Sequence, residues 1–182
     1  MYRAIFMDRD GTILEEVGYM YHSGLYKLFS WSGPAIRKIN EHGMKAVVIT
    51  NQSGVGRGYF DEASVEDVHG ILRTELAAQN AKLDAIYACI HHPEAGCDCR
   101  KPNTGMLLKA RDEMNIDLTQ SFVIGDKYLD VETAHNVGAK GILVLTGYGR
   151  EEQEKHKSSK LQPDLVADNL MSAVDAILDG AV

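Results

Sequence analysis

The stretch RAIFMDRDGT (residues 3–12) decides the fold. Residues 3–7 form a short, mainly apolar run, and such a run that ends in an aspartate is typical of a buried strand. Asp8 and Asp10 follow two residues apart, so both side chains can point the same way beyond the strand end. Gly11 then allows a tight backbone turn. This carboxylate pair offers one nucleophile and one acid, although Asp and Gly are also common in surface turns.

Segments with strand and helix patterns alternate along the rest of the chain. This alternation predicts an α/β fold with a doubly wound, Rossmann-like parallel sheet and helices on both faces. The charged stretch at residues 150–160 is expected to form a solvated loop or helix. We predict further strands at residues 44–50, 85–90, 121–125, 141–145 and 165–167, and helices at 33–43, 64–80, 104–115, 129–137 and 170–178.

The composition is that of a globular protein with one domain. The chain has 182 residues, of which 45% are hydrophobic and 25% charged, and we find no repeat or linker, so one domain is expected over residues 1–182. The net charge of -7 argues against a nucleic-acid partner. No apolar stretch approaches membrane-spanning length, and three cysteines do not make a disulfide framework. We therefore expect a cytoplasmic monomer with reduced thiols.

The polar segments that follow the predicted strands are the candidate site. In a sheet of this kind, ligands bind beyond the carboxyl ends of the strands. The segments there are DRDGT (8–12), TNQSGVG (50–56), CIHHPEAGCDCRKP (89–102) and GDKYLD (125–130). They combine carboxylates, a hydroxyl group and a lysine, which are the groups needed for phosphoryl transfer with a hard divalent cation.

Two further carboxylates point to magnesium. Asp126 and Asp130 join the Asp8–Asp10 pair at the same edge of the predicted sheet. Several carboxylates in one crevice repel one another unless a cation lies among them. Oxygen ligands without neighbouring His or Cys select Mg²⁺ over softer metals. Asp130 can instead cap the helix that follows, so we do not assign it as a direct ligand.

The third segment predicts a structural zinc site. Three thiols and one imidazole make a complete tetrahedral set, which closes the site to substrate. The alternative is three reduced thiols packed as small apolar residues, but HPEAGCDC is too polar for that. Zinc at Cys99 would fix where Arg100 and Lys101 point, because they follow it directly in the chain. The candidate ligands are Cys89, His91, Cys97 and Cys99, with His92 as a second candidate for the nitrogen ligand.

The order DRDGT, TNQSG, a lysine and GDKYLD resembles the motifs of the haloacid dehalogenase (HAD) superfamily of phosphohydrolases. The resemblance implies that Asp8 is the nucleophile that takes the phosphoryl group. Asp10 would protonate the leaving oxygen and then activate water. Mg²⁺ would be bound by the carboxylates of Asp8 and Asp126 and by the backbone carbonyl of Asp10. Thr50 and Lys101 would stabilise the phosphoryl group.

The zinc loop and EEVGY (residues 15–19) narrow the resemblance to the zinc-containing D-glycero-D-manno-heptose 1,7-bisphosphate 7-phosphatases. It implies a small phosphosugar substrate and removal of its 7-phosphate. Histidinol-phosphate phosphatases share the zinc loop and are the alternative; a catalytically silent, zinc-stabilised binding module is another. The implied substrate pocket comprises Glu16, Val17, Gly18, Tyr19, Thr50, Asn51, Gln52, Ser53, Arg100, Lys101 and Lys127.

The spacing of the motifs leaves no room for a cap domain. The residues between Asp10 and Thr50 suffice for a loop and one helix, and those between Thr50 and Lys101 for a helix, a strand and the zinc loop. We therefore expect an open site that is served by loops.

Overall fold

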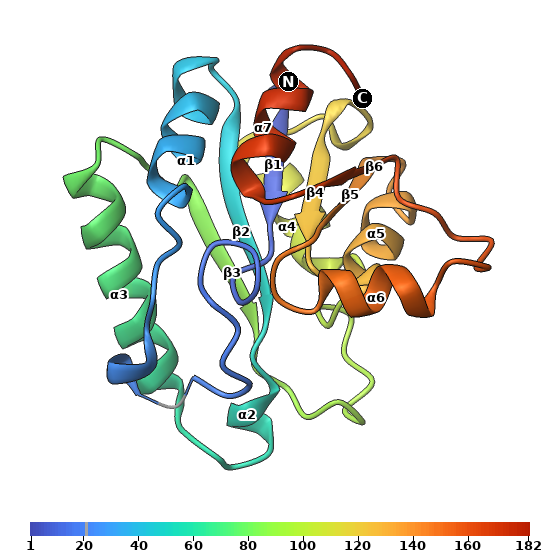
Figure 1. Cartoon of the computed structure of the whole chain (residues 1–182). Helices are drawn as coiled ribbons and strands as arrows, with labels where there is room; N and C mark the ends of the chain where they lie inside the picture. Colours follow the sequence, from blue (N-terminus) through green and yellow to red (C-terminus); the bar gives the residue numbers. More distant parts are fainter. Residues whose placement is uncertain (21) are drawn as a thin grey trace.

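A single parallel sheet forms the centre of the computed structural model, which describes residues 1–20 and 22–182 (Figure 1). Its six strands lie in the order β3-β2-β1-β4-β5-β6, and all neighbours pair in parallel. The strand order reverses between β1 and β4, so this is the switch point at which ligands bind in such sheets. The strands are β1 (Ala4–Met7), β2 (Lys45–Asn51), β3 (Ala85–Cys89), β4 (Phe122–Gly125), β5 (Lys140–Val144) and β6 (Leu165–Ala167).

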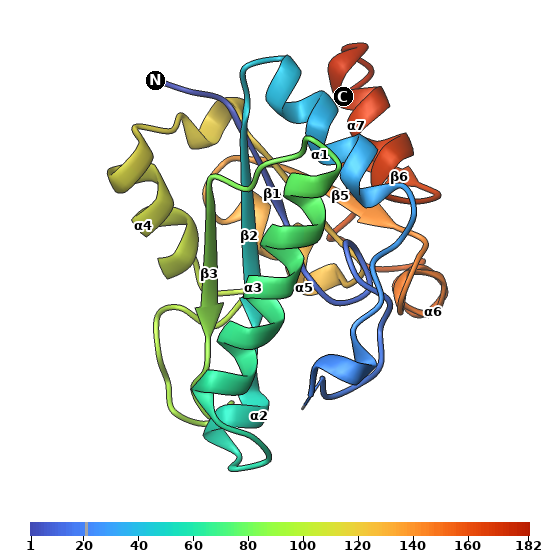
Figure 2. The same cartoon turned by 90° about the vertical axis from the view of Figure 1, so that its left-hand side faces the viewer.

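Helices cover both faces of this sheet (Figures 1 and 2). Buried residues of α1, α3 and α7 share one core with the sheet, and those of α4 share the opposite core with Ala134 of α5. The predicted doubly wound architecture is therefore confirmed. The helices are α1 (Ser32–Glu41), α2 (Ser53–Gly56), α3 (Glu62–Ala78), α4 (Gly105–Met114), α5 (Tyr128–His135), α6 (Gly149–Lys155) and α7 (Leu170–Leu178), with 3-10 turns η1 (Ser23–Leu25) and η2 (Leu118–Gln120).

The alternation of side chains along β1 explains why the strand lies at the centre of the sheet. Ile5 and Met7 belong to the core under α1, α3 and α7, whereas Ala4 and Phe6 belong to the core under α4. All four residues are fully buried. Successive side chains of a strand point to opposite faces, so an apolar run with no polar position must be covered on both sides. Asp8, the residue that follows β1, therefore lies at the edge of the apolar core.

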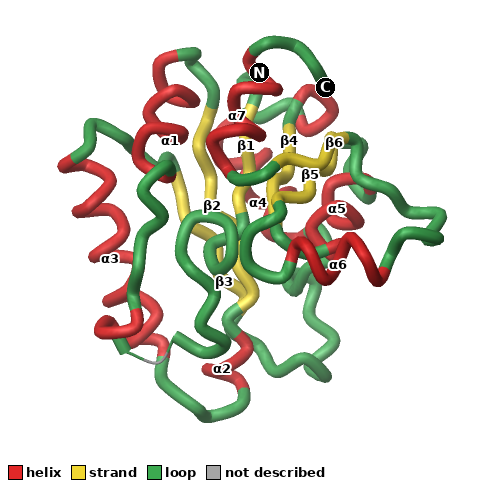
Figure 3. The backbone as a smooth tube through the Cα atoms, in the orientation of Figure 1, coloured by secondary structure: helices red, strands yellow, loops and turns green. Residues whose placement is uncertain are grey.

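Loops, and not a second domain, surround the C-terminal ends of the strands. Of residues 8–20 and 22–31, which join β1 to α1, only the η1 turn is helical (Figure 3). The connection from β2 to β3 holds α2 and α3. In the described part of the chain there is thus no cap domain, as predicted. The charged stretch after residue 149 begins as α6, whereas α2 was not predicted because SGVG is typical of a loop.

The described helices include none that is both long enough and apolar enough to cross a membrane.

Candidate active site

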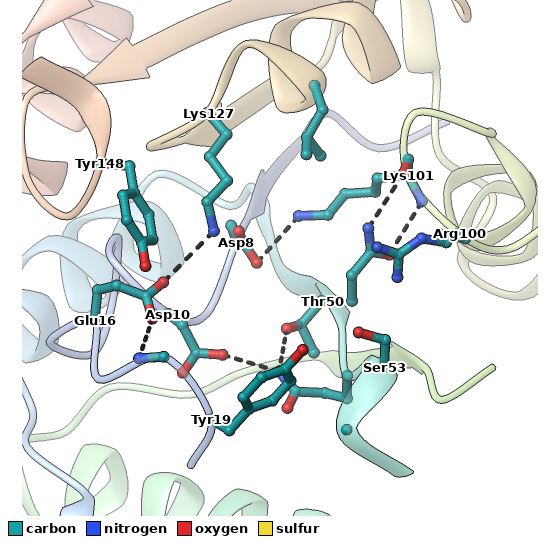
Figure 4. A pocket seen from close by; sticks show the side chains of 15 residues that line it. Asp8, Asp10, Glu16, Tyr19, Thr50, Ser53, Arg100, Lys101, Lys127 and Tyr148 are labelled. Atoms are coloured by element: carbon teal, nitrogen blue, oxygen red, sulfur yellow. Dashed lines mark hydrogen bonds and ion pairs between the residues drawn. The ribbon is translucent and has the colours of Figure 1, made fainter. Parts of the chain in front are cut away.

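A cleft of about 290 Å³ opens beyond the C-terminal ends of the central strands (Figure 4). It gathers the four predicted catalytic residues and all predicted substrate-binding residues except Val17, which is 40% exposed and does not line the cleft. Of the other three lining residues, Gly54 and Leu129 belong to the predicted segments TNQSGVG and GDKYLD, whereas Tyr148 was not predicted. The full lining is Asp8, Asp10, Glu16, Gly18, Tyr19, Thr50, Asn51, Gln52, Ser53, Gly54, Arg100, Lys101, Lys127, Leu129 and Tyr148.

Asp8 is held in one orientation at the floor of the cleft. Its backbone N–H donates to the carbonyl of Ile124 at 2.9 Å, which extends the pairing of β1 with β4. Its Oδ1 accepts the backbone N–H of Arg9 at 2.8 Å and lies 3.0 Å from Lys101 Nζ. Both contacts fall on one carboxylate oxygen, so the direction of the other, Oδ2, is fixed as well.

Lys101 bridges two buried carboxylates. Its Nζ lies 2.6 Å from Asp130 Oδ1 and 3.0 Å from Asp8 Oδ1, and its side chain is only 1% exposed. Burial acts to lower the pKa of Lys101, but the charges of Asp130 and Asp8 outweigh burial and raise it. The lysine is therefore charged. It offsets the negative charge of the site from one side.

Asp126 presents an unpaired oxygen to the same place. Carboxylate oxygens of Asp8, Asp126 and Asp130 lie within 4.8 Å of one another. Asp126 Oδ2 accepts the backbone N–H of Tyr148 at 2.9 Å, whereas Oδ1 is buried with no hydrogen-bond partner among the described residues. Burial, followed by the charge of Asp8, raises the pKa of Asp126 to about 8. A cation between Asp8 and Asp126 would satisfy the unpaired oxygen, so the donor set fits Mg²⁺.

Asp130 is engaged elsewhere, in line with the capping role considered for it. Besides its ion pair with Lys101, it accepts the backbone N–H of Lys127 through Oδ2 at 3.3 Å, at the start of α5. Both of its oxygens therefore have partners within the protein. Burial raises its pKa to about 6, and Lys101 acts against this shift.

Two glycines allow the loops around Asp126 to approach it closely. Gly11 has φ +80° and Gly147 has φ +52°, and a Cβ atom on either would overlap Asp126 Oδ2. Both positions therefore require glycine for space as well as for conformation. Gly11 brings the Asp8 loop against Asp126, and Gly147 brings the loop after β5 against the same carboxylate.

Asp10 is fixed by donors from two directions. Arg9 donates to both of its oxygens, from Nε at 3.1 Å and from Nη2 at 2.9 Å. Gln52 Nε2 donates to Oδ2 at 2.8 Å and also to the Thr50 hydroxyl at 2.8 Å. Gln52 was predicted from the resemblance to bind substrate. Gln52 lines the cleft, and its amide also links two predicted catalytic residues.

Asn51 ties the end of β2 to Lys101. Its amide Nδ2 donates to the carbonyl of Lys101 at 3.2 Å, and its Oδ1 accepts the N–H of Lys101 at 3.1 Å. In addition, the N–H of Gln52 donates to the carbonyl of Cys89 at 2.7 Å. The side chain of Asn51 thus positions the lysine, a role that was not predicted for it.

The predicted zinc ligands lie together at the end of β3. The three sulfur atoms are 3.0–3.5 Å apart. His91 Nδ1 lies 3.1 Å from Cys99 Sγ and 3.7 Å from Cys89 Sγ, whereas His92 Nδ1 accepts the backbone N–H of Glu94 at 3.3 Å. His91 is therefore the imidazole of the cluster. Three thiols and one imidazole form a donor set that fits Zn²⁺.

The wall formed by Glu16, Lys127 and Tyr148 was only partly predicted. Lys127 Nζ lies 3.5 Å from Glu16 Oε2 and 4.6 Å from the centroid of the Tyr148 ring (Figure 4). Burial raises the pKa of Glu16, and Lys127 acts against this shift. Tyr148 follows β5, a strand after which the sequence predicts no site residue. The tight GYG turn (residues 147–149) is the signal that could have identified it.

The chain is similar to known proteins in family, sequence and structure. Residues 98–173 match a family described as HAD-hydrolase-like. The chain is 43% identical to the D-glycero-beta-D-manno-heptose-1,7-bisphosphate 7-phosphatase of Escherichia coli (strain K12) over 79% of this chain and 80% of the relative. It is 38% identical to the D-glycero-D-manno-heptose-1,7-bisphosphate 7-phosphatase of Thermosynechococcus vestitus, over 96% of this chain and 94% of that one.

A solved structure of the same enzyme type superimposes closely. The D,D-heptose 1,7-bisphosphate phosphatase from B. bronchiseptica, complexed with magnesium and phosphate, matches with a TM-score of 0.91 and 29% identity, over 98% of this chain and 99% of that one. The fold, the four motifs at the strand ends and these relatives agree. The chain belongs to the D-glycero-D-manno-heptose-1,7-bisphosphate 7-phosphatase family of HAD-like hydrolases.

Proposed function

We propose that the protein is a Mg²⁺-dependent phosphatase that converts D-glycero-D-manno-heptose 1,7-bisphosphate to heptose 1-phosphate and inorganic phosphate. The observation that carries this proposal is that Asp8 and Lys101 line one open cleft, while a carboxylate oxygen of the buried Asp126 lies close enough to Asp8 to share a cation. The names of the relatives support the choice of substrate. The magnesium and phosphate bound to the similar enzyme support the choice of metal.

The chemistry follows from the roles proposed for four residues. Asp8 attacks phosphorus while the bond to the sugar oxygen breaks, and Asp10 gives its proton to that oxygen. Asp10 then takes a proton from a water molecule, which attacks the aspartyl phosphate and releases phosphate and free Asp8. Lys101 and the Thr50 hydroxyl stabilise the negative charge on the transferring oxygens.

The carboxylates of Asp8 and Asp126, with the backbone carbonyl of Asp10, would hold the magnesium ion. When bound, Mg²⁺ polarises the phosphoryl oxygens and offsets the repulsion between carboxylates. Asp126 suits this role because its Oδ1 is buried without a partner among the described residues.

Arg100 favours a bisphosphate over histidinol phosphate. It lines the cleft, and its Nη1 is buried without a hydrogen-bond partner among the described residues. A second phosphate or sugar hydroxyl groups would satisfy this donor, whereas the ammonium group of histidinol phosphate would be repelled by it. This contrast separates the two phosphatase candidates.

We expect kcat/KM to be at least about tenfold higher for a heptose 1,7-bisphosphate than for histidinol phosphate, a difference of about 1.4 kcal/mol. The measurement is release of inorganic phosphate from the α and β heptose bisphosphates and from histidinol phosphate, each with and without Mg²⁺. Faster turnover of histidinol phosphate would instead assign the protein to the histidinol-phosphate phosphatases. A lack of phosphate release from every substrate with Mg²⁺ present would favour the silent binding module.

We propose that the cluster at Cys89, His91, Cys97 and Cys99 holds a structural zinc ion. Removing zinc should lower the melting temperature and raise KM, because the loop that presents Arg100 has little apolar burial to order it. Scanning fluorimetry and phosphate-release kinetics on zinc-stripped protein, with Mg²⁺ kept in excess, would measure both effects. Re-addition of zinc provides the control. Unchanged stability and kinetics in metal-analysed, zinc-free protein would contradict this role.

We further propose that the enzyme works in the cytoplasm. All three cysteines are free and gathered at the proposed zinc site, so they need surroundings that keep thiols reduced.

A further inference from the structure

Arg9 is a charged side chain enclosed in the protein interior. It is 1% exposed and is among the largest fully buried side chains in the described chain. An arginine is almost never buried to this extent unless its donors are paired. Two of its nitrogens, Nε and Nη2, bond to the two oxygens of Asp10. Planar two-point contact of this kind fixes the orientation of a carboxylate as well as its position.

The third nitrogen of Arg9 bonds to His69, which belongs to α3. Arg9 Nη1 lies 3.2 Å from His69 Nε2, and His69 is also 1% exposed. Burial, followed by the charge of Arg9, lowers the pKa of His69 to about 4. The imidazole is therefore neutral at pH 7. Because a guanidinium can only donate, Nε2 is the acceptor and the proton lies on Nδ1, 3.4 Å from Glu66 Oε1.

Asp10 lies between this buried pair and the cleft. Its side chain is 17% exposed and lines the cleft, while Arg9 contacts it from the interior. Gln52 holds the Asp10 carboxylate from a second direction through its hydrogen bond to Oδ2. Without His69, one buried N–H of Arg9 would lose its acceptor, and the guanidinium could turn to find another. The carboxylate of Asp10 would then no longer be held in a fixed orientation by its two contacts with Arg9.

We propose that Arg9 and His69 are positioning residues that hold Asp10 in the orientation from which it transfers its proton. This inference rests on the proposed function, because it takes Asp10 as the acid that protonates the sugar oxygen. His69 lies on a helix outside the four motifs, so α3 contributes to the chemistry through Arg9 without touching substrate.

The nature of the leaving group separates positioning from a purely structural role. When the phosphorus–oxygen bond breaks, the electron pair goes to the leaving oxygen. A sugar oxygen then needs the proton of Asp10, because an alkoxide is a poor leaving group. The p-nitrophenolate ion leaves without a proton at neutral pH. A misplaced Asp10 therefore slows phosphoryl transfer from the sugar phosphate more than transfer from p-nitrophenyl phosphate.

Single-turnover kinetics on His69→Leu that follow the appearance of heptose 1-phosphate or p-nitrophenol would test this difference, because these products form in the transfer to Asp8, before the water step. We expect the rate with heptose bisphosphate to fall roughly tenfold, with little change in substrate binding, and the rate with p-nitrophenyl phosphate to stay within about twofold. His69→Gln should restore most of the sugar-phosphate rate, because its amide oxygen can accept from Arg9. Val68→Ala, a fully buried neighbour on α3, should lower stability and leave the ratio of the two rates unchanged.

Equal loss with both substrates, or no loss with either, would overturn the proposal. If His69→Leu does not fold, Arg9→Lys keeps a positive charge, removes the two-point contact, and should change the ratio in the same direction. The Asp10→Asn variant distinguishes a failure of the proposed function from a failure of the positioning role. If Asp10→Asn keeps the full sugar-phosphate rate, the proton-transfer role itself is wrong. If Asp10→Asn is inactive but His69→Leu leaves the ratio unchanged, only the positioning role fails.

Discussion

Replacing Asp8 with Asn should reduce phosphate release from heptose bisphosphate by roughly 10⁴-fold or more, because the amide cannot form an aspartyl phosphate. The fold should persist, since Lys101 keeps its ion pair with Asp130. Mass spectrometry of acid-quenched protein should detect a phosphoryl adduct during turnover of the wild-type enzyme and none in the variant. The melting temperature of the variant measures whether it is folded.

A matched control for this variant is Asp112→Asn on α4. Asp112 has a side chain that is 66% exposed and pairs with Arg111 at 2.7 Å. Its replacement removes the same charge from the chain and should leave kcat and KM unchanged. Substantial turnover by a folded Asp8→Asn protein, beyond what contaminating wild-type enzyme explains, would reject Asp8 as the nucleophile.

Replacing Lys101 with Met should reduce both activity and stability. The substitution leaves Asp8 and Asp130 buried without their shared cation, and the loss of one partner from a buried ion pair typically costs about 3–5 kcal/mol of unfolding free energy. Activity should fall by at least about 10²-fold, because the charge beside the phosphoryl oxygens disappears. Chemical denaturation and steady-state kinetics would measure the two effects.

The stability loss in Lys101→Met should grow as pH rises. Burial already raises the folded-state pKa of Asp130 to about 6, and loss of the lysine would raise it further. A carboxyl group with a raised folded pKa destabilises the protein above its unfolded pKa, and this effect fades once pH falls low enough to protonate it in both states. The difference from wild type should therefore be larger at pH 8 than at pH 5.

Lys109→Met on α4 is the control for the loss of a lysine. Lys109 has a side chain that is 63% exposed and lies 3.9 Å from Glu113. Exposed pairs of this kind contribute little, so this variant should match wild type at both pH values. A Lys101→Met protein with the same stability loss at pH 5 and pH 8 would show that the buried carboxylates are not the cause.

The sheet and its motif residues could be predicted because their signals are local. The apolar run of β1 and the polar residues that follow each strand are adjacent in sequence, and parallel strands carry such residues to one edge. The metal-binding and catalytic candidates were recognised on this basis. The structure brings the catalytic candidates into one cleft and gathers the metal-binding candidates in two clusters, and the roles of all these residues stay predictions.

The contacts that support the site could not be predicted, because they join distant parts of the chain. His69 looks like any polar residue of α3 until the fold brings it to Arg9. Asn51 was predicted only as part of the substrate pocket, and its two hydrogen bonds with the backbone of Lys101 have no signal in the sequence. Tyr148 follows a strand whose loop contains no carboxylate. A single sequence encodes such partners without a periodic or compositional signal.

The absence of a cap in the described chain has a consequence for the catalytic cycle. Enzymes that close a lid often wait for that lid to open before product departs. Here the cleft is open and no cap covers it in the described residues, so substrate and product can exchange without a domain movement. A cleft without a cap stays open to bulk water, so with the roles proposed above the lifetime of the aspartyl phosphate would depend on how quickly Asp10 activates the next water molecule.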